Sequence, residues 1–188
     1  MVLVLAALAA WFAWTLRGDC RKADGRFDPW AAFETYVSLF LMLCMLMSSV
    51  AQVLVRYLFS DLVDLPWTEE FGRLALIWAG FWGGAALQRA DDHISMTVVF
   101  DLLPERAKLA VRLFGDIVTL AVLAPIVWLG WESARNLDIM HAISLGLPLS
   151  VFAYPVPVAG ALMVLHTVAL MVRRLTGRPP VRHLEPAV

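Results

Sequence analysis

Long uncharged stretches alternate with short polar connections along this sequence. No Asp, Glu, Lys or Arg occurs from Thr35 to Val55 or from Ala142 to Val172. An α-helix needs about 20 predominantly apolar residues to cross the hydrocarbon core of a bilayer. The pattern therefore predicts a protein that crosses a membrane several times.

Four spans follow from this pattern, over residues 29–57, 67–88, 113–131 and 148–172. Pro125 marks a kink point in the third span. Pro155 and Pro157 predict an irregular start to the fourth, because proline removes a backbone hydrogen-bond donor. We expect an all-α fold: a multi-pass membrane helical bundle of four transmembrane helices.

The first residues form a further apolar run, VLVLAALAAWFAWTL, at residues 2–16. As a helix this run would extend about 22 Å, which is short for a span. Basic residues follow the run and none precedes it, which is unlike the order in a secretory signal. We expect a retained N-terminal apolar helix, either at the membrane interface or inserted as a short extra span.

The basic residues of the connections predict the orientation of the spans. They concentrate in three segments: Arg17, Arg21, Lys22 and Arg26 before the first span, Arg89, Arg106, Lys108 and Arg112 in the central connection, and Arg173, Arg174, Arg178 and Arg182 near the end. The connection at 60–67 has no basic residue, and the 133–147 loop has only Arg135. Since basic connections stay inside, residues 17–29, the central connection and the C-terminus are expected in the cytoplasm.

The central connection, DDHISMTVVFDLLPERAKLAVRLFGD, is too polar to span. Its apolar residues recur at helical spacing, and Pro104 followed by Glu105 is typical of a helix start. We expect a short amphipathic cytoplasmic segment that leads into the third span. The chain then divides into an N-terminal helix with a basic linker (1–28), a membrane domain (29–175) and a cytoplasmic tail (176–188).

Composition agrees with the membrane assignment. Hydrophobic residues make up 61% of the chain and charged residues 16%, whereas about a quarter of a soluble domain is charged. The formal net charge is −1, so nucleic acid is not an expected partner. Cys20 and Cys44 are far apart and form no metal-ligand pattern.

The stretch PWTEEFGRLALIWAGFWGGA places three charged residues directly against the apolar part of the second span. Trp67 suits an interfacial anchor, so the charges are expected at or just inside the outer membrane boundary. Glu69 and Glu70 precede Arg73 by four and three residues, and both spacings allow an ion pair on a helix.

Arg56 ends the first span, and a tight hairpin would bring it to the same boundary as Glu69 and Glu70. We predict an ion-pair network that pins the first two spans together. Contact with a partner subunit is a compatible second role, and an acid/base or proton relay is the remaining alternative.

The second span also has two different faces. At about 100° per residue, Glu69, Arg73, Gly80 and Gly84 fall near one line, and Phe71, Ala75, Trp78 and Trp82 fall on the opposite side. Small residues four apart allow another backbone to approach closely. We therefore expect the charged face to pack on protein and the tryptophan face to meet lipid or a second, larger protein.

The histidines offer little chemistry. Of the four, only His166 lies within a span, whereas four-helix membrane cytochromes bind haem between facing histidines. No Gly-rich phosphate loop, Ser/His/Asp set or metal spacing occurs, so we expect no catalytic, metal or cofactor site and no enzyme. A haem- or quinone-binding membrane anchor and a free-standing membrane scaffold are the alternatives.

Four segments in order, VLVRYLF, LPWTEEFGRLALIWAGFWGGA, DDHISMTVVFDLLP and GLPLSVFAYPVPVAGALMVLH, resemble a known family. It is the small membrane subunit of tripartite ATP-independent periplasmic (TRAP) transporters, of the DctQ type. The resemblance covers about residues 35 to 175. Its elements are Arg56-Tyr57, the group Trp67, Glu69, Glu70 and Arg73, His93-Ile94, and Gly146-Leu147-Pro148 with Tyr154 and Pro157.

The resemblance implies a scaffold subunit in the bacterial inner membrane. Its partner would be a large multi-span subunit that carries the substrate and sodium sites and moves as an elevator. A separate periplasmic binding protein would deliver an organic acid, such as a dicarboxylate. Arg56, Trp67, Glu69, Glu70 and Arg73 would then be architectural or interface residues. The N-terminal apolar run departs from the pattern, because many members lack it.

Overall fold

The computed structural model describes residues 28–58, 66–90 and 104–177. Its long helices are α2 (Pro29–Leu58), α3 (Pro66–Ala90), α5 (Glu105–Asn136) and α7 (Pro155–Leu175). A short 3-10 helix, η2 (Leu137–Ile139), and a one-turn helix, α6 (Ser150–Ala153), lie between α5 and α7. The prediction of an all-α fold is confirmed.

Prolines mark the starts of all four long helices, with Pro29 at the start of α2 and Pro66 at the start of α3. α5 begins at Glu105 directly after Pro104, as the sequence predicted. α7 begins at Pro155 after the separate turn α6, which is the irregular start predicted for the last span. Proline is tolerated in a first turn because its missing N–H would have no helical partner there. Pro125 lies inside α5, which continues past it as one helix.

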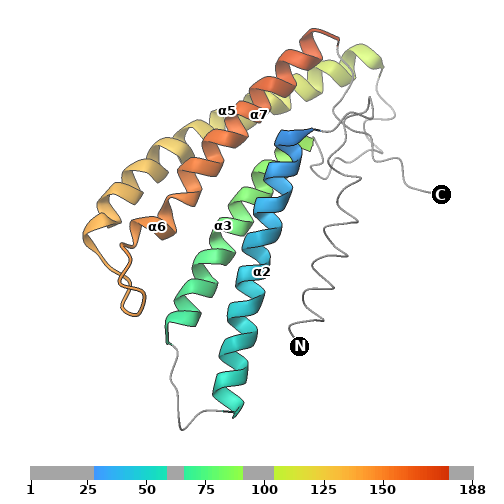
Figure 1. Cartoon of the computed structure of the whole chain (residues 1–188). Helices are drawn as coiled ribbons and strands as arrows, with labels where there is room; N and C mark the ends of the chain where they lie inside the picture. The colour runs from blue at the N-terminus through green and yellow to red at the C-terminus, as the bar shows by residue number, and fades with distance from the viewer. Residues whose placement is uncertain (1–27, 59–65, 91–103, 178–188) are drawn as a thin grey trace, which may run out of the picture.

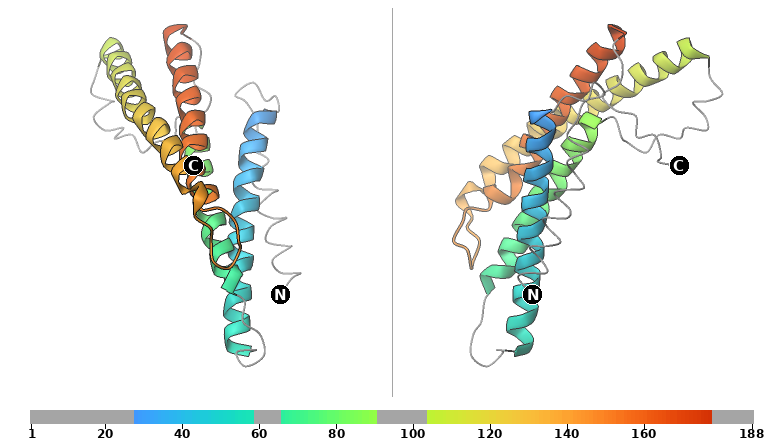
Figure 2. Two further views of the ribbon diagram at one scale, coloured as in Figure 1. Left: turned by 90° about the vertical axis from the view of Figure 1, so that its left-hand side faces the viewer. Right: turned by 45° about the vertical axis from the view of Figure 1, so that its right-hand side comes forward.

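The helices form an open row rather than a closed bundle (Figure 1). α2 packs on α3, α3 packs on α7, and α7 packs on α5. The row therefore consists of two hairpins, α2–α3 and α5–α7, joined through α3 and α7. The hairpins diverge from each other, and α2 and α5 lie at the two edges of the row (Figure 2).

Three stretches are long and apolar enough to cross a membrane, namely residues 29–57, 107–139 and 150–175. α3 does not reach the same hydropathy, because charged residues, glycines and tryptophans interrupt its apolar sequence. Its 25 residues still give it a length of about 37 Å. The structure thus supports three of the four predicted spans, and the span in α3 stays a prediction.

Several predicted segments lie outside the described residues. These are the N-terminal apolar helix with its linker, residues 91–103 of the central connection, and the tail from residue 178. The described part of the central connection, residues 105–112, forms the first turns of α5 and so leads directly into the third span.

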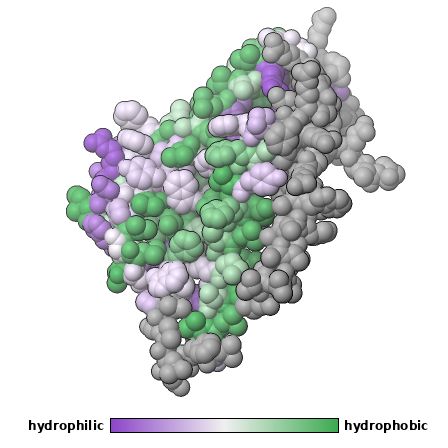
Figure 3. All heavy atoms as spheres, viewed as in Figure 1, coloured by the Kyte–Doolittle hydropathy of each residue, from purple (hydrophilic) through white to green (hydrophobic). Residues whose placement is uncertain are grey.

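Small residues fill the space between the helices. The buried hydrophobic residues of the described segments are Ala31, Ala32, Ala75, Ala85, Ala134, Ala159 and Leu170. Large apolar side chains such as Phe40, Phe114 and Trp128 are exposed. In Figure 3, hydrophobic residues (green) mix with weakly polar ones (pale) in the middle of the face, and the strongly hydrophilic residues lie at its edges. Helices that associate in lipid show this arrangement, because small residues let backbones approach while large ones face the hydrocarbon.

Gly160 of α7 lies in close contact with α5. A Cβ atom on Gly160 would lie 2.8 Å from Val127 Cγ2, inside the contact distance of two carbon atoms. Val127 is β-branched and has few alternative rotamers, so it cannot easily move away.

We expect Gly160→Leu to destabilise the chain, because the new side chain meets Val127 in a closed contact. Overpacking of this kind costs about 1–3 kcal/mol, which should lower the midpoint of thermal unfolding in detergent. Gly80→Leu is the matched control, since no atom lies within 4 Å of a Cβ at Gly80. Equal midpoints for the two variants would contradict the packing of α5 on α7.

Candidate functional site

The polar side chains of the described helices gather at two opposite ends of the molecule. The charged end contains the start of α2, the end of α3 and the last turns of α7. The loop end contains residues 137–149 together with the start of α3. The two ends use different kinds of contact.

The centre of the charged end is the carboxylate of Glu34, whose side chain is 0% exposed. Its Oε2 accepts a hydrogen bond from Arg89 Nε at 2.6 Å, and its Oε1 lies 2.7 Å from His166 Nε2. Arg89 also reaches Asp28 Oδ2 at 3.3 Å, while Asp28 Oδ1 accepts from the backbone N–H of Trp30 at 3.1 Å. A single buried carboxylate thus joins α2, α3 and α7.

Both carboxylate oxygens of Glu34 have polar partners, and these contacts offset the free-energy cost of burying the charge. An isolated carboxylate loses several kcal/mol on leaving water unless it gains charged or hydrogen-bonded partners. Two further contacts lie at the same end. Gln88 Nε2 donates to Thr167 Oγ1 at 2.9 Å, which adds a second bridge between α3 and α7. Arg174 donates to Asp116, which ties α7 to α5.

At the loop end, Glu70 fixes the connection between η2 and α6. Its carboxylate accepts the backbone N–H of Leu145 at 2.8 Å and that of Ser144 at 3.1 Å and 3.2 Å. Gly146 closes the loop by donating to the carbonyl oxygen of Ala142 at 3.0 Å, with a φ of 64° that favours glycine. α3 therefore holds a loop that is 74 residues away in the sequence.

The predicted charged group of α3 is only partly formed. Glu69 and Arg73 make the expected pair at 2.9 Å, with side chains 61% and 60% exposed. The expected pair between Glu70 and Arg73 is replaced by the contact of Glu70 with the loop. Arg56 is exposed at the end of α2, and the structure records no ion pair between it and these acids. Trp67 is exposed at the start of α3.

The first two helices are instead joined at this end by an uncharged contact. Ser48 of α2 donates a hydrogen bond to the backbone carbonyl of Thr68 in α3. Both residues are buried. Of the predicted ion-pair network between the first two spans, the described residues form only the Glu69–Arg73 pair, because Glu70 accepts backbone N–H groups of the loop instead.

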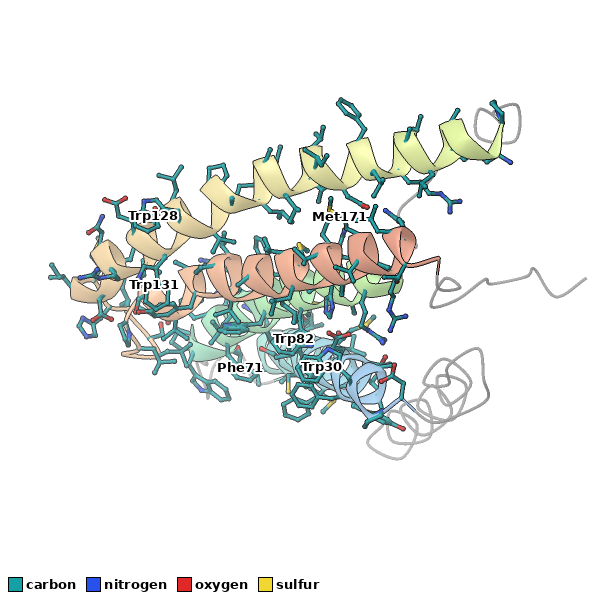
Figure 4. All side chains as sticks on the ribbon, turned by 90° about the horizontal axis from the view of Figure 1, so that it is seen from above. Trp30, Phe71, Trp82, Trp128, Trp131 and Met171 are labelled. Carbon is teal, nitrogen blue, oxygen red and sulfur yellow. The ribbon has the colours of Figure 1, made fainter. Side chains whose placement is uncertain are left out.

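Trp78 and Trp82 of α3 contact neighbouring helices, although they were predicted to face lipid or a larger protein. Trp78 Nε1 donates to the carbonyl oxygen of Val151 in α6 at 3.1 Å. The ring of Trp82 lies 6.0 Å from that of Phe33 in α2, in an edge-to-face arrangement. Figure 4 shows Trp82 near Trp30, on the α2 side of the row.

The two glycines of the opposite face have different surroundings. Gly84 packs on α7 as predicted, since a Cβ there would lie 2.7 Å from Met163 Cε. Gly80 is exposed and has no atom within 4 Å of a Cβ position. The reason is that α3 has neighbours on two sides, α2 and α7, so that only part of its surface remains open.

The sequence interpretation missed Glu34 and Arg89, which are the central pair of the charged end. A signal was available: Glu34 is an acid inside an apolar helix, and the antiparallel order of the first two spans places Arg89 beside it. His166 lies in the contact of α7 with α2. Of the other histidines, His141 is exposed in the loop, and His93 and His183 lie outside the described residues.

Comparison with known proteins gives a consistent result. The family described as tripartite ATP-independent periplasmic transporters, DctQ component, matches residues 45–177. A sialic acid TRAP transporter small permease protein, SiaQ, of Vibrio cholerae is 30% identical over 131 residues, which cover 70% of this chain and 75% of that protein. A putative TRAP transporter small permease protein of Haemophilus influenzae is 29% identical over 112 residues, 59% of this chain and 68% of that protein.

We expect Glu34→Ala to destabilise the chain strongly, because it leaves Arg89 and His166 without their buried partner. Removal of one member of a buried ion pair costs about 3–5 kcal/mol. The matched control is Glu69→Ala, which removes an exposed pair worth at most about 1 kcal/mol. Chemical unfolding of both variants in detergent micelles measures the difference, and similar losses for both would show that the Glu34 contacts contribute little.

Glu70→Ala should loosen the loop without unfolding the helices. The amide hydrogens of Ser144 and Leu145 lose their acceptor, so their exchange with deuterated solvent should become faster by about tenfold, the effect of one charge-assisted hydrogen bond. Glu69→Ala again serves as control, since Glu69 does not contact the loop. Unchanged exchange in Glu70→Ala would mean that the loop is held by its own backbone contacts.

Proposed function

Because the chain belongs to the DctQ component family of TRAP transporters, we propose that it supports the large transport subunit of one such transporter. It is a small TRAP permease subunit. The proposed partner is a large multi-span membrane subunit that carries the substrate and sodium sites. A periplasmic binding protein would deliver the substrate to this pair.

The open row of helices is the observation that carries this role. In the described residues, α2, α3, α7 and α5 lie side by side, and α2 and α5 do not close into a bundle. The buried ionisable groups of these helices are satisfied by one another at the charged end. Such an arrangement favours a supporting surface over a path for a solute, because a path needs polar groups along an enclosed interior.

The orientation follows from the basic residues. Arg89, Arg173 and Arg174 lie at the charged end, and basic residues favour the cytoplasmic side, which supports the proposal that this end faces the cytoplasm in the bacterial inner membrane. The loop end, with Glu70 and the 137–149 segment, then faces the periplasm. In this orientation the loop end lies on the side from which a binding protein would approach.

The proposed cargo of the transporter is an organic acid, with uptake driven by sodium. The Vibrio cholerae relative is named for sialic acid, which carries a carboxylate, and a dicarboxylate is the other candidate. The choice between them would depend on the partner subunits, because the buried carboxylates of the described helices, Glu34 and Asp116, pair with arginines of this same chain.

The open face of α3 is the proposed contact with the large subunit. Leu76 and Leu87 are exposed on α3 with Gly80 between them, and a residue without a side chain allows a partner helix to approach closely. We expect Gly80→Leu to reduce copurification of the large subunit with tagged full-length chain by about tenfold, the effect of overpacking one helix contact.

Gly115→Leu on α5 is the matched control, since Gly115 is also exposed with no atom within 4 Å of a Cβ position. It should leave copurification unchanged, and the reverse result would move the contact from α3 to α5. A purified chain that has no partner in mild detergent and transports a carboxylate into liposomes by itself would overturn the proposed function.

A further inference from the structure

A cavity of about 420 Å³ opens at the charged end, between the start of α2, the end of α3 and α7. This volume lies in the range of about 300–1,000 Å³ found for small-molecule sites. Polar lining comes from Asp28, Arg89, His166 and Arg173. The rest of the lining is apolar and comes mostly from α7.

Some charged side chains that line the cavity have partners of opposite charge among the described residues, and one does not. Arg89 contacts both Asp28 and Glu34, and Glu34 also contacts His166. Asp28 has its second oxygen engaged with the first backbone N–H groups of α2. Arg173 differs from these residues: its side chain is exposed, and the structure records no ion pair for it within the described segments. The cavity therefore has one cation available for an anionic ligand.

The apolar lining leads away from this cation along one face of α7. Leu162, Leu165 and Ala169 line the cavity at intervals of three and four residues, and Arg173 follows four residues later, so that all four share a helix face. Leu165 is 65% exposed, which leaves the groove open toward the surroundings of the helix.

The length of this face matches one leaflet of a membrane. Leu162 and Arg173 are separated by about 16 Å along the helix axis, and half of a hydrocarbon core of about 30 Å is about 15 Å. Trp30, which also lines the cavity, is 49% exposed, and tryptophan prefers the boundary between headgroups and hydrocarbon.

We propose that this cavity binds one phospholipid, with the phosphate group on Arg173 and an acyl chain along Leu162, Leu165 and Ala169. The ligand must be anionic at one end and apolar over the length of a leaflet, and a phospholipid of the surrounding membrane has both properties. The site is independent of the transport partner and of the substrate. It would fill the divergence between the α2–α3 and α5–α7 hairpins at the charged end.

The test uses the full-length chain, purified in detergent, stripped of lipid and mixed with phosphatidylglycerol. Native mass spectrometry then counts the lipid molecules that remain bound. We expect the unmodified chain to retain one lipid and Arg173→Gln to lower this retention about tenfold, the loss of a charge-assisted contact with phosphate. Arg135→Gln, which changes an exposed arginine at the loop end, is the matched control and should retain the lipid.

A second variant leaves the arginine in place. Ala169→Trp fills the groove from an exposed position and should also release the lipid, so that the test does not depend on the folding of Arg173→Gln. Glycerol 3-phosphate, which has the phosphate without the chain, should fail to compete. The proposal is overturned if Arg173→Gln or Ala169→Trp retains lipid like the unmodified chain, or if Arg135→Gln loses as much. Displacement by glycerol 3-phosphate would assign the site to a soluble phosphate instead.

Discussion

The buried carboxylate of Glu34 is the contact on which the arrangement of the described helices depends. Apolar contacts between helices contribute little specificity in a bilayer, because lipid tails are as apolar as leucine. The buried hydrophobic residues here are almost all alanines, which permit close approach but do not select a partner. Glu34 makes that selection, since Arg89 and His166 on two other helices must lie within hydrogen-bond distance of its two oxygens.

α7 is the helix through which the two hairpins are joined. It contacts α3 on one side and α5 on the other, and each contact includes polar residues at the charged end: His166 and Thr167 toward α2 and α3, Arg174 toward α5. Toward the loop end the contacts are hydrogen bonds to the backbone: Trp78 donates to a carbonyl oxygen and Glu70 accepts from N–H groups, and neither binds a charged side chain. A displacement of α7 would therefore have to break ion pairs at one end and loop contacts at the other.

The sequence could predict the features that depend on residues close together in the chain. Uncharged stretches located the long helices, Pro104 and Pro155 located two of their starts, and the four-residue spacing located the Glu69–Arg73 pair. The charged end could not be found in this way, because its partners lie 55 and 132 residues apart. Helical spacing also divided α3 into two faces, but it assigned Trp78 and Trp82 to the outside and Gly80 to the packed side, where the structure leaves Gly80 exposed. A helix with two neighbours has only a narrow open surface, and periodicity alone does not say which surface that is.

The open row explains why a chain of this size would act with a partner. A closed bundle buries its apolar interior within itself, whereas a row of helices leaves two broad apolar faces that lipid or another protein must cover. The ionisable groups buried in the described helices already pair with one another, so a partner on those faces does not need to supply opposite charges. Recognition then depends on shape: on where a backbone can come close, as at Gly80, and on where large side chains such as Phe114 and Trp128 project. Lipid can cover the faces that a protein does not, as proposed for the cavity at the charged end.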